Sequence, residues 1–209
     1  MPQKAGKAVL ALLFVILIGV VNVAFAQEDG RFDASLGAAG VLTKQSSGNG
    51  TVLNPTNSGA VVATFRYRFN PRHSIEFNYA HTRDSQIYTE GADQFRIQST
   101  ISEYTGAYVL NFFQHGKVEP FVFAGGGALK FNPGNTYIDT YQLPVAVVSQ
   151  TELAFLYGGG ADYRVVPHVA IRLQYRGLIY KAPDFQGPGF FTGQRGHLAE
   201  PSIGIVFRF

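Results

Sequence analysis

Residues 61–69 read Val-Val-Ala-Thr-Phe-Arg-Tyr-Arg-Phe. The odd-numbered positions carry only apolar or aromatic side chains, whereas the even-numbered positions include Arg66 and Arg68. Successive side chains of a β-strand point to opposite sides, so this period of two predicts a strand whose faces meet different surroundings. Turning either arginine toward hydrocarbon would cost roughly 2–4 kcal/mol at a bilayer midplane. The stretch therefore predicts a strand with an aromatic face toward lipid and a charged face enclosed.

Seven further segments alternate in the same way, and no stretch after Gln27 is better explained by the 3.6-residue period of a helix. In the fifth segment we assign Phe121, Phe123, Leu129 and Phe131 to the lipid face. The apolar faces fall within residues 32–38, 61–69, 75–79, 104–112, 121–131, 153–163, 169–175 and 203–209.

Short and long connections alternate between these segments. The short ones, at residues 70–72, 114–117 and 166–168, have turn chemistry. The long ones, at about 42–59, 84–95, 132–149 and 182–194, are rich in Gly, Asn, Ser, Thr and Pro. An even number of strands with this alternation is typical of a membrane barrel with tight periplasmic turns and larger external loops. We predict an all-β protein, an eight-stranded antiparallel up-and-down transmembrane β-barrel.

The faces opposite the apolar ones carry acids and bases in equal number. In a barrel of eight strands the interior is just wide enough for side chains to fill it. We therefore expect a polar core of paired charges, a barrel-interior ionic network, and no wide aqueous pore. Its predicted members are Asp33, Arg66, Arg68, Glu76, Glu103, Glu152, Asp162, Arg164, Arg172, Arg176 and Arg208, with Glu119, Lys130 and Glu200 on the same faces.

Alternation by itself does not say which face is inside, because a soluble barrel around a ligand also alternates. Two features favour the membrane. The apolar face is rich in Phe and Tyr, as membrane interfaces require, and the charged face is balanced and contains many glycines.

Residues 1–26 have the pattern of a cleavable signal peptide. Lys4 and Lys7 precede an apolar run, and Ala24-Phe25-Ala26 supplies a small-residue cleavage site. This leaves residues 27–209 for the barrel. The chain has no Cys, 15% charged residues and a net charge of +3, which excludes disulfides and thiolate chemistry and gives no basic stripe for nucleic acid.

The last residues, 202–209, read Ser-Ile-Gly-Ile-Val-Phe-Arg-Phe. Ser202, Gly204, Phe207 and Phe209 resemble the terminal assembly signal of outer-membrane barrels. With the strand pattern, the chain resembles the small eight-stranded proteins of the OmpA membrane domain, OmpX and opacity-protein type. The resemblance implies a bacterial outer-membrane location, insertion by the barrel-assembly machinery, contact with outer-membrane lipid and lipopolysaccharide, and variable external loops.

Three functions are compatible with such a barrel. The first is a non-enzymatic role in envelope structure or surface interaction, with an extracellular protein partner at the loops. On the lipid-facing parity the residues become polar at His81, so strand pairing is expected to continue beyond the membrane and raise residues 82–102 as a ribbon. That ribbon would offer an edge for strand addition.

The second function is a narrow channel for small solutes, for which Leu143 to Val148 would form an apolar mouth. The third is a lipid-modifying enzyme, for which His81, Asp84 and Ser85 are the nearest candidates for a catalytic triad. Their spacing does not match the known barrel hydrolase motif, and we predict no enzyme activity. We also predict no cofactor and no metal, because His73, His115 and His168 lie at separate turns without carboxylate partners.

Overall fold

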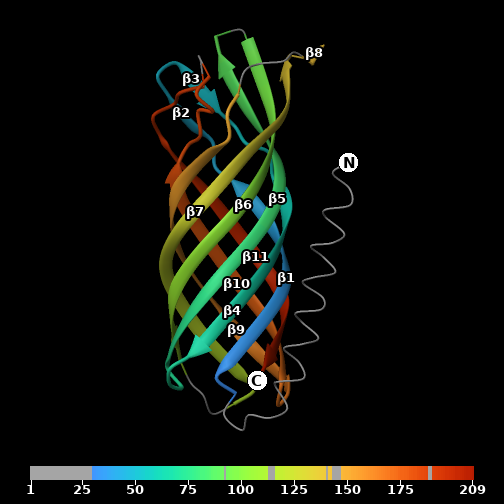
Figure 1. Ribbon diagram of the computed structural model, residues 1–209, viewed down its shortest axis with the longest axis vertical. Coiled ribbons are helices and arrows are strands. Elements are labelled where there is room, and N and C mark those ends of the chain that lie inside the picture. The colour runs from blue at the N-terminus through green and yellow to red at the C-terminus, as the bar shows by residue number, and fades with distance from the viewer. Residues whose placement is uncertain (1–29, 92, 113–115, 140, 143–146, 188–189) are drawn as a thin grey trace.

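The computed structural model describes residues 30–91, 93–112, 116–139, 141–142, 147–187 and 190–209. Eight antiparallel strands form a closed barrel, as predicted (Figure 1). Three short strands, β2 (Ser46–Gly48), β3 (Thr51–Leu53) and β8 (Tyr141–Gln142), lie outside it. The barrel strands are β1 (Phe32–Thr43), β4 (Ser58–Arg68), β5 (His73–Glu90), β6 (Asp93–Asn111), β7 (Val118–Ile138), β9 (Gln150–Val166), β10 (Val169–Lys181) and β11 (Arg195–Arg208).

The first and last strands close the barrel. β1 pairs with β4 on one side and with β11 on the other, and Phe32 and Phe209 exchange both backbone hydrogen bonds. Every neighbouring pair of barrel strands is hydrogen-bonded, so the eight paired strands leave no open edge in the barrel wall. No helix among the described residues is long and apolar enough to cross a membrane.

The two ends of the barrel differ. At the short-turn end, which holds Pro71, His168 and Phe209, the Asn70 side chain accepts hydrogen bonds from the amides of Arg72 and His73 and closes a tight turn. At the opposite, long-loop end lie β2, β3, β8 and the tips of β5 and β6 (Figure 1).

The outer face is apolar on all eight strands. Phe65, Phe77 and Leu173 are among the exposed aromatic and aliphatic side chains of this face. The predicted parity is confirmed for seven strands and is wrong for β7, where Phe121, Phe123, Leu129 and Phe131 are buried inside the barrel. Glu119 and Lys130 are separated by an odd number of positions, so they cannot share a face. Glu119 is buried and Lys130 is exposed on the outside.

The ribbon predicted at residues 82–102 is confirmed. β5 and β6 pair without a register shift from His73↔Leu110 to Glu90↔Asp93, so residues 84–90 are strand and not part of a long loop. On the outside of β5, the unbroken run of apolar positions ends at Tyr79, and His81, Arg83 and Ser85 follow. β7 accompanies the ribbon as far as the pair Phe95↔Ile138. We call residues 81–102 with the end of β7 the extension.

Candidate functional site

The half of the interior nearest the short-turn end is built from buried ion pairs. Arg66 on β4 lies opposite Glu76 on β5 and donates from Nη2 to its Oε2 at 2.9 Å. Arg172 on β10 lies opposite Asp162 on β9 and binds both its oxygens, at 2.7 and 2.9 Å. Cross-strand register therefore delivers each cation to its anion, which a buried charge requires.

The ring of Phe121 lies between these two pairs. The guanidinium carbon of Arg66 is 4.3 Å from the ring centroid and that of Arg172 is 5.1 Å from it. Both distances are within the range of a cation–π contact. Phe121 therefore replaces the water that would otherwise solvate the faces of the two guanidinium groups.

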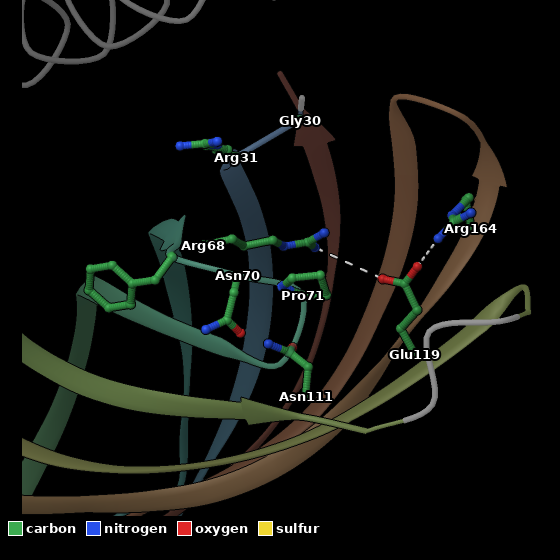
Figure 2. A pocket seen from close by; sticks show the side chains of 9 residues that line it. Gly30, Arg31, Arg68, Asn70, Pro71, Asn111, Glu119 and Arg164 are labelled. Carbon is green, nitrogen blue, oxygen red and sulfur yellow. Dashed lines mark hydrogen bonds and ion pairs between the residues drawn. The ribbon is translucent and has the colours of Figure 1, made fainter. Parts of the chain in front are cut away.

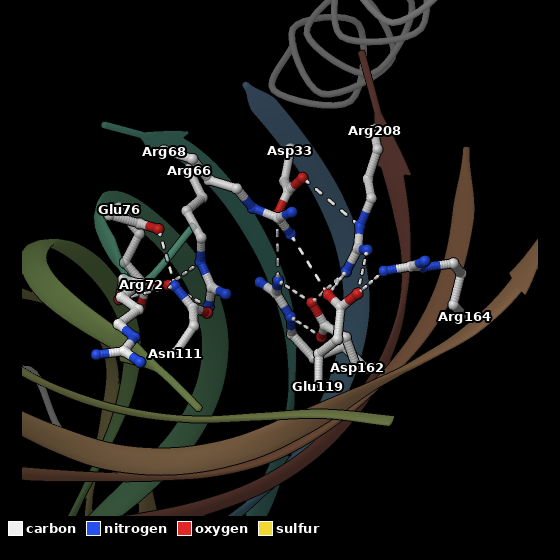
Figure 3. A network of polar contacts seen from close by, with 12 residues as sticks. Asp33, Arg66, Arg68, Arg72, Glu76, Asn111, Glu119, Asp162, Arg164 and Arg208 are labelled. Carbon is white, nitrogen blue, oxygen red and sulfur yellow. Dashed lines mark hydrogen bonds and ion pairs between the residues drawn. The ribbon is translucent and has the colours of Figure 1, made fainter. Parts of the chain in front are cut away.

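A second layer lies closer to the short-turn end (Figure 3). Arg68 donates to Asp33 at 2.7 Å, and Arg208 is 2.7 Å from Glu119 and 3.2 Å from Asp162. Arg164 also donates to Glu119, so this carboxylate is shared between two arginines.

A hollow of about 400 Å³ opens beside this layer (Figure 2). Arg68 and Arg164 reach Glu119 from opposite sides of it, and Arg31, Asn70 and Asn111 also line it. The hollow ends at the ionic layer, because Arg66 and Arg172 behind it are buried and paired.

A separate cluster lies farther along the barrel. Arg176 on β10 donates to Glu103 and lies 3.6 Å from Glu200, its cross-strand partner on β11. Glu152 stands outside both clusters: it is half-buried, accepts a hydrogen bond from Gln150, and makes no ion pair among the described residues. Every predicted member of the ionic network except Glu152 thus belongs to one of two clusters of ion pairs, and Lys130, which was expected on the same face, lies outside the barrel.

The half of the interior nearest the long-loop end is aromatic, which the sequence reasoning missed. Phe185 and Phe190, from the connection between β10 and β11, are buried there. The ring centroid of Tyr88 is 4.8 Å from that of Phe190, and Phe131 packs against Tyr180 and Phe185. We call this set of five residues the aromatic plug. Glu119 and the phenylalanines of β7 all occupy odd-numbered positions. Placing the charge of Glu119 inside the barrel would therefore have placed Phe131 inside as well.

Polar contacts hold the connection in place. The Tyr88 hydroxyl donates to the carbonyl of Pro183 at 2.7 Å. The side-chain oxygen of Gln150 accepts from the amides of Asp184 and Phe185 at 3.0 and 2.8 Å. The plug is therefore anchored from β5 and from β9.

Asp84 is a buried carboxyl in the extension, beyond the apolar band. Gln86 donates to it at 2.7 Å, while its second oxygen has no hydrogen-bond partner among the described residues. Burial raises the pKa of Asp84 to about 7, although the bond from Gln86 opposes this shift.

The candidate catalytic residues are not assembled. Asp84 points into the barrel, whereas His81 and Ser85 are on outward positions of β5. His81 and Ser85 are four residues apart on an extended strand, about 13 Å, too far for a hydrogen bond. The described residues also contain no group of three His, Cys, Asp or Glu that could hold a metal. His115 lies outside the described residues.

The glycine triplets serve close packing. A Cβ on Gly158 would lie 2.5 Å from the ring of Phe123, so this glycine makes room for an inward aromatic side chain. Ser202 and Gly204 lie on β11 and Phe207 faces outward, while Phe209 follows the strand. The predicted signal peptide, residues 1–26, and residues 143–146 lie outside the described residues; Val147 packs against the buried apolar cluster and Val148 is exposed.

Comparisons with known proteins agree with this architecture. The family model described as an outer membrane protein β-barrel domain matches residues 10–209. The comparison with curated proteins gives no match.

Three solved structures illustrate the likeness. Neisserial surface protein A is 16% identical, with 87% of this chain and 98% of that chain covered and a TM-score of 0.53. Ail of Yersinia pestis, in complex with the heparin analogue sucrose octasulfate, is 17% identical, with 85% and 97% covered and a TM-score of 0.50. OprG of Pseudomonas aeruginosa is 15% identical, with 85% and 95% covered and a TM-score of 0.50. At these identities the likeness concerns the fold.

Proposed function

Because the chain belongs to the outer membrane protein β-barrel family and is a protein of the bacterial outer membrane, we propose that it is a closed, non-enzymatic barrel that acts at the cell surface through the extension. In this proposal the short-turn end faces the periplasm and the long-loop end faces the exterior, as in other outer-membrane barrels.

The observation that carries the proposal is the doubly closed interior. The layer of Arg66, Arg172 and Phe121 fills one half of the barrel, and the aromatic plug fills the other. Moving an ion through the first layer would separate buried charge pairs, and moving it through the second would take it through apolar surroundings. A static barrel of this kind supports binding at its outer rim better than transport.

The extension is suited to binding through its side chains. Residues 51–56 cover the β5 edge of the ribbon: Leu53 pairs with Tyr88, and the Thr56 amide donates to Ser85 at 2.9 Å. On the other side β7 carries Pro133, which cannot donate to a further strand, and β8 pairs with its tip. Strand addition, one expectation from the sequence, is therefore disfavoured in the proposal, which relies on the outward face of the ribbon.

A shortened hairpin tests the proposal. Arg83 and Thr100 are register partners, so joining them by Asn-Gly in place of residues 84–99 keeps the register of the remaining strands. Bacteria that display this variant are expected to adhere to host-cell or matrix-coated surfaces at the background level of cells without the protein. The readout is the number of adherent cells.

The matched control replaces only residues 91–92 by Asn-Gly, which leaves the ribbon intact. Heat-dependent migration in detergent gels confirms that both variants reach the outer membrane folded. If the shortened variant adheres as well as the unchanged protein, or if the unchanged protein does not adhere above background, the extension is not the working surface.

One observation favours a second candidate, a gated channel for small apolar solutes. The aromatic plug is built largely from a connection between strands, and its Phe185 and Gln186 have φ of 46° and 56°, in the left-handed region that disfavours such residues. A plug held in a strained backbone could leave its apolar chamber when a ligand replaces it. The hydrogen-bonded wall offers no gap for sideways exit at the membrane level.

A further inference from the structure

Asp84 is a buried carboxylate for which the chain supplies no cation. The residue is 7% exposed and makes no ion pair among the described residues. Between Gly30 and Phe209, the residues outside the described ranges include no Lys and no Arg. A buried charge requires a partner, so the cation that would balance Asp84 has to come from another molecule.

Three neighbouring side chains in the extension each have an oxygen without a hydrogen-bond partner. These atoms are Oδ1 of Asp84, Oε1 of Gln86 and Oγ of Ser99, and all three are buried. Asp84 and Ser99 are cross-strand partners, and Gln86 is the next inward residue of β5. Buried polar atoms are nearly always hydrogen-bonded. We call these three residues the acceptor group, since what it lacks is a donor.

A hollow of about 500 Å³ adjoins the acceptor group. Asp84 and Ser99 both belong to its lining, and beside Ser99 the pairing of β6 with β7 shifts register. Such a shift bends the strand and redirects its side chains. The only other charged residue of the lining is Arg83, which occupies an outward position of β5, whereas Asp84 is inward. The rest of the lining consists of Thr56, Ser85, Gln98, Thr100, Gly134 and Asn135.

The interior on this side of the barrel has more acids than bases. Beyond the layer of buried arginine pairs, the described inward positions of the barrel strands carry Asp84, Glu103, Glu152 and Glu200, and the single base Arg176. Arg176 donates to Glu103 and lies 3.6 Å from Glu200, so it is already engaged. A cleft with charge of one sign raises the local concentration of ions of the other sign. The long-loop end of the interior therefore attracts cations.

The acceptor group fits one kind of cation in particular. An ammonium group has three N–H donors, one positive charge and no acceptor, which matches three free oxygens and one carboxylate. Calcium would need about six to eight oxygen ligands. A guanidinium group prefers both oxygens of a carboxylate, but Oδ2 of Asp84 already accepts a hydrogen bond from Gln86 at 2.7 Å.

We propose that the acceptor group and the adjoining hollow bind a primary ammonium group of an extracellular ligand, either a lysine side chain of a polypeptide or a free amine. The ammonium donates to Asp84, Gln86 and Ser99, and the rest of the ligand leaves through the hollow. This inference rests on the proposed function, because it names the chemistry that the extension recognises and needs the long-loop end to face the exterior.

An NMR titration of the purified, folded protein in zwitterionic detergent micelles tests the site without any cell. Burial raises the pKa of Asp84 to about 7, so the titration is run at pH 8, where the carboxylate and a lysine ammonium are both charged. The probes are butylammonium and a blocked peptide with one lysine, and the amide signals of residues 84–86 and 98–100 are followed. Asp84→Asn keeps the shape and is expected to bind both probes about 10- to 100-fold more weakly, because a hydrogen bond to a charged group is lost.

Two controls isolate the charge of the site. Arg83→Gln removes the other charge of the lining and is expected to bind the probes at least as tightly as the unchanged protein. The same peptide with its lysine acetylated has no ammonium group and is expected not to bind. Tighter binding of the lysine peptide than of butylammonium identifies a polypeptide as the source of the ammonium, and equal binding identifies a free amine.

The proposal is overturned if Asp84→Asn binds like the unchanged protein, if the acetylated peptide binds equally well, or if no probe shifts these signals. It is also overturned if calcium at the same concentration produces the same shifts and prevents the amines from binding. Adhesion of whole cells is scored separately. A protein that binds the probes but does not adhere contradicts the proposed function alone, and one that adheres but does not bind them contradicts this inference alone.

Discussion

At the scale of single residues, this barrel shows how an arginine is kept inside a membrane. Arg66 and Arg172 are fully buried, yet each faces a carboxylate on the neighbouring strand and the ring of Phe121. The register of the paired strands places each arginine directly opposite its carboxylate. The two members of such a pair depend on each other, because removing one of them leaves the other charge buried without a partner.

Replacing Arg66 by Ala is therefore expected to lower the free energy of unfolding by about 3–5 kcal/mol, because Glu76 would lose its ion pair. The measurement is urea-induced unfolding in detergent micelles. Because the chain has no Trp, unfolding is followed by circular dichroism. Arg72→Ala is the matched control, since the Arg72 side chain is exposed. An unfolding curve for Arg66→Ala that coincides with that of the control would contradict the assigned pair.

Asp84 makes the stability of the extension depend on pH. Its pKa is raised by burial from 3.8 to about 7, so the folded protein holds a proton that the unfolded chain releases between these values. The free energy of unfolding is therefore expected to be highest below the window and to fall as the pH rises from about 4 to about 7.

Unfolding measured from pH 4 to pH 8 tests this sign, and Asp84→Asn is the control because the amide keeps the shape and cannot titrate. The variant should lose that part of the pH dependence and be more stable than the unchanged protein at pH 8. A pH profile that is the same in both proteins would show that Asp84 is solvated.

At the scale of elements, constant register explains both the confirmed ribbon and the missed face. β5 and β6 keep one register over their whole length, so their outward residues stay outward into the extension. In β7 no charged residue lies between Glu119 and Lys130, and the outward side there is made of small residues such as Ala124 and Gly126. Both faces of that stretch are uncharged, so polarity alone does not define its orientation.

Packing on the outer wall requires a glycine at position 177, where an aromatic ring from the neighbouring strand lies against the backbone. The ring of Tyr157 on β9 lies across Gly177 on β10, and the Tyr157 hydroxyl is hydrogen-bonded to Nε2 of His197 on β11 at 2.8 Å. A Cβ at Gly177 would be 2.4 Å from this ring. Gly177→Val is therefore expected to displace Tyr157 and destabilise the barrel by about 1–3 kcal/mol in the same unfolding assay.

The control for this change is Gly40→Val, also on an outward position, where the nearest atom to a new Cβ is 4.0 Å away. It should change stability by much less. Equal losses in the two variants would mean that the cost comes from strand propensity and not from the Tyr157 contact.

At the scale of the whole molecule, the interior has two layers of different chemistry. The ionic layer lies toward the short-turn end and the aromatic plug toward the long-loop end, so in the proposed closed barrel each would block the passage independently. A polar filling throughout was the expectation from the sequence, and the aromatic half corrects it.

The double variant Phe185→Ala/Phe190→Ala separates the two candidate functions. It is expected to bind an apolar fluorescent probe, since truncation leaves an apolar cavity, and to remain electrically silent in planar bilayers like the unchanged protein, because the ionic layer stays in place. Stable conductance steps from either protein would favour the gated channel over the closed barrel.

The alternation of side chains along the chain was enough to predict the strand-rich fold, the number of strands in the barrel and the orientation of seven of them. It could do so because each outward face must satisfy hydrocarbon and each inward face carries charges that hydrocarbon rejects, and these demands are met residue by residue along a strand. The same logic predicted that β5 and β6 continue beyond the membrane, since outward residues become polar at His81.

What fills the barrel, and which charged side chains form pairs, could be seen only in the folded chain. Whether Glu103 pairs with Arg176, and why Glu152 stands apart, depends on the stagger of distant strands. The aromatic plug depends on a connection folding back through the mouth, where no repeating pattern guides the chain. His81 and Lys130 are likewise nearly fifty positions apart and lie on either side of Ser102 only because β5, β6 and β7 are side by side. Contacts of this kind are set by closure of the whole sheet, and local alternation carries no information about them.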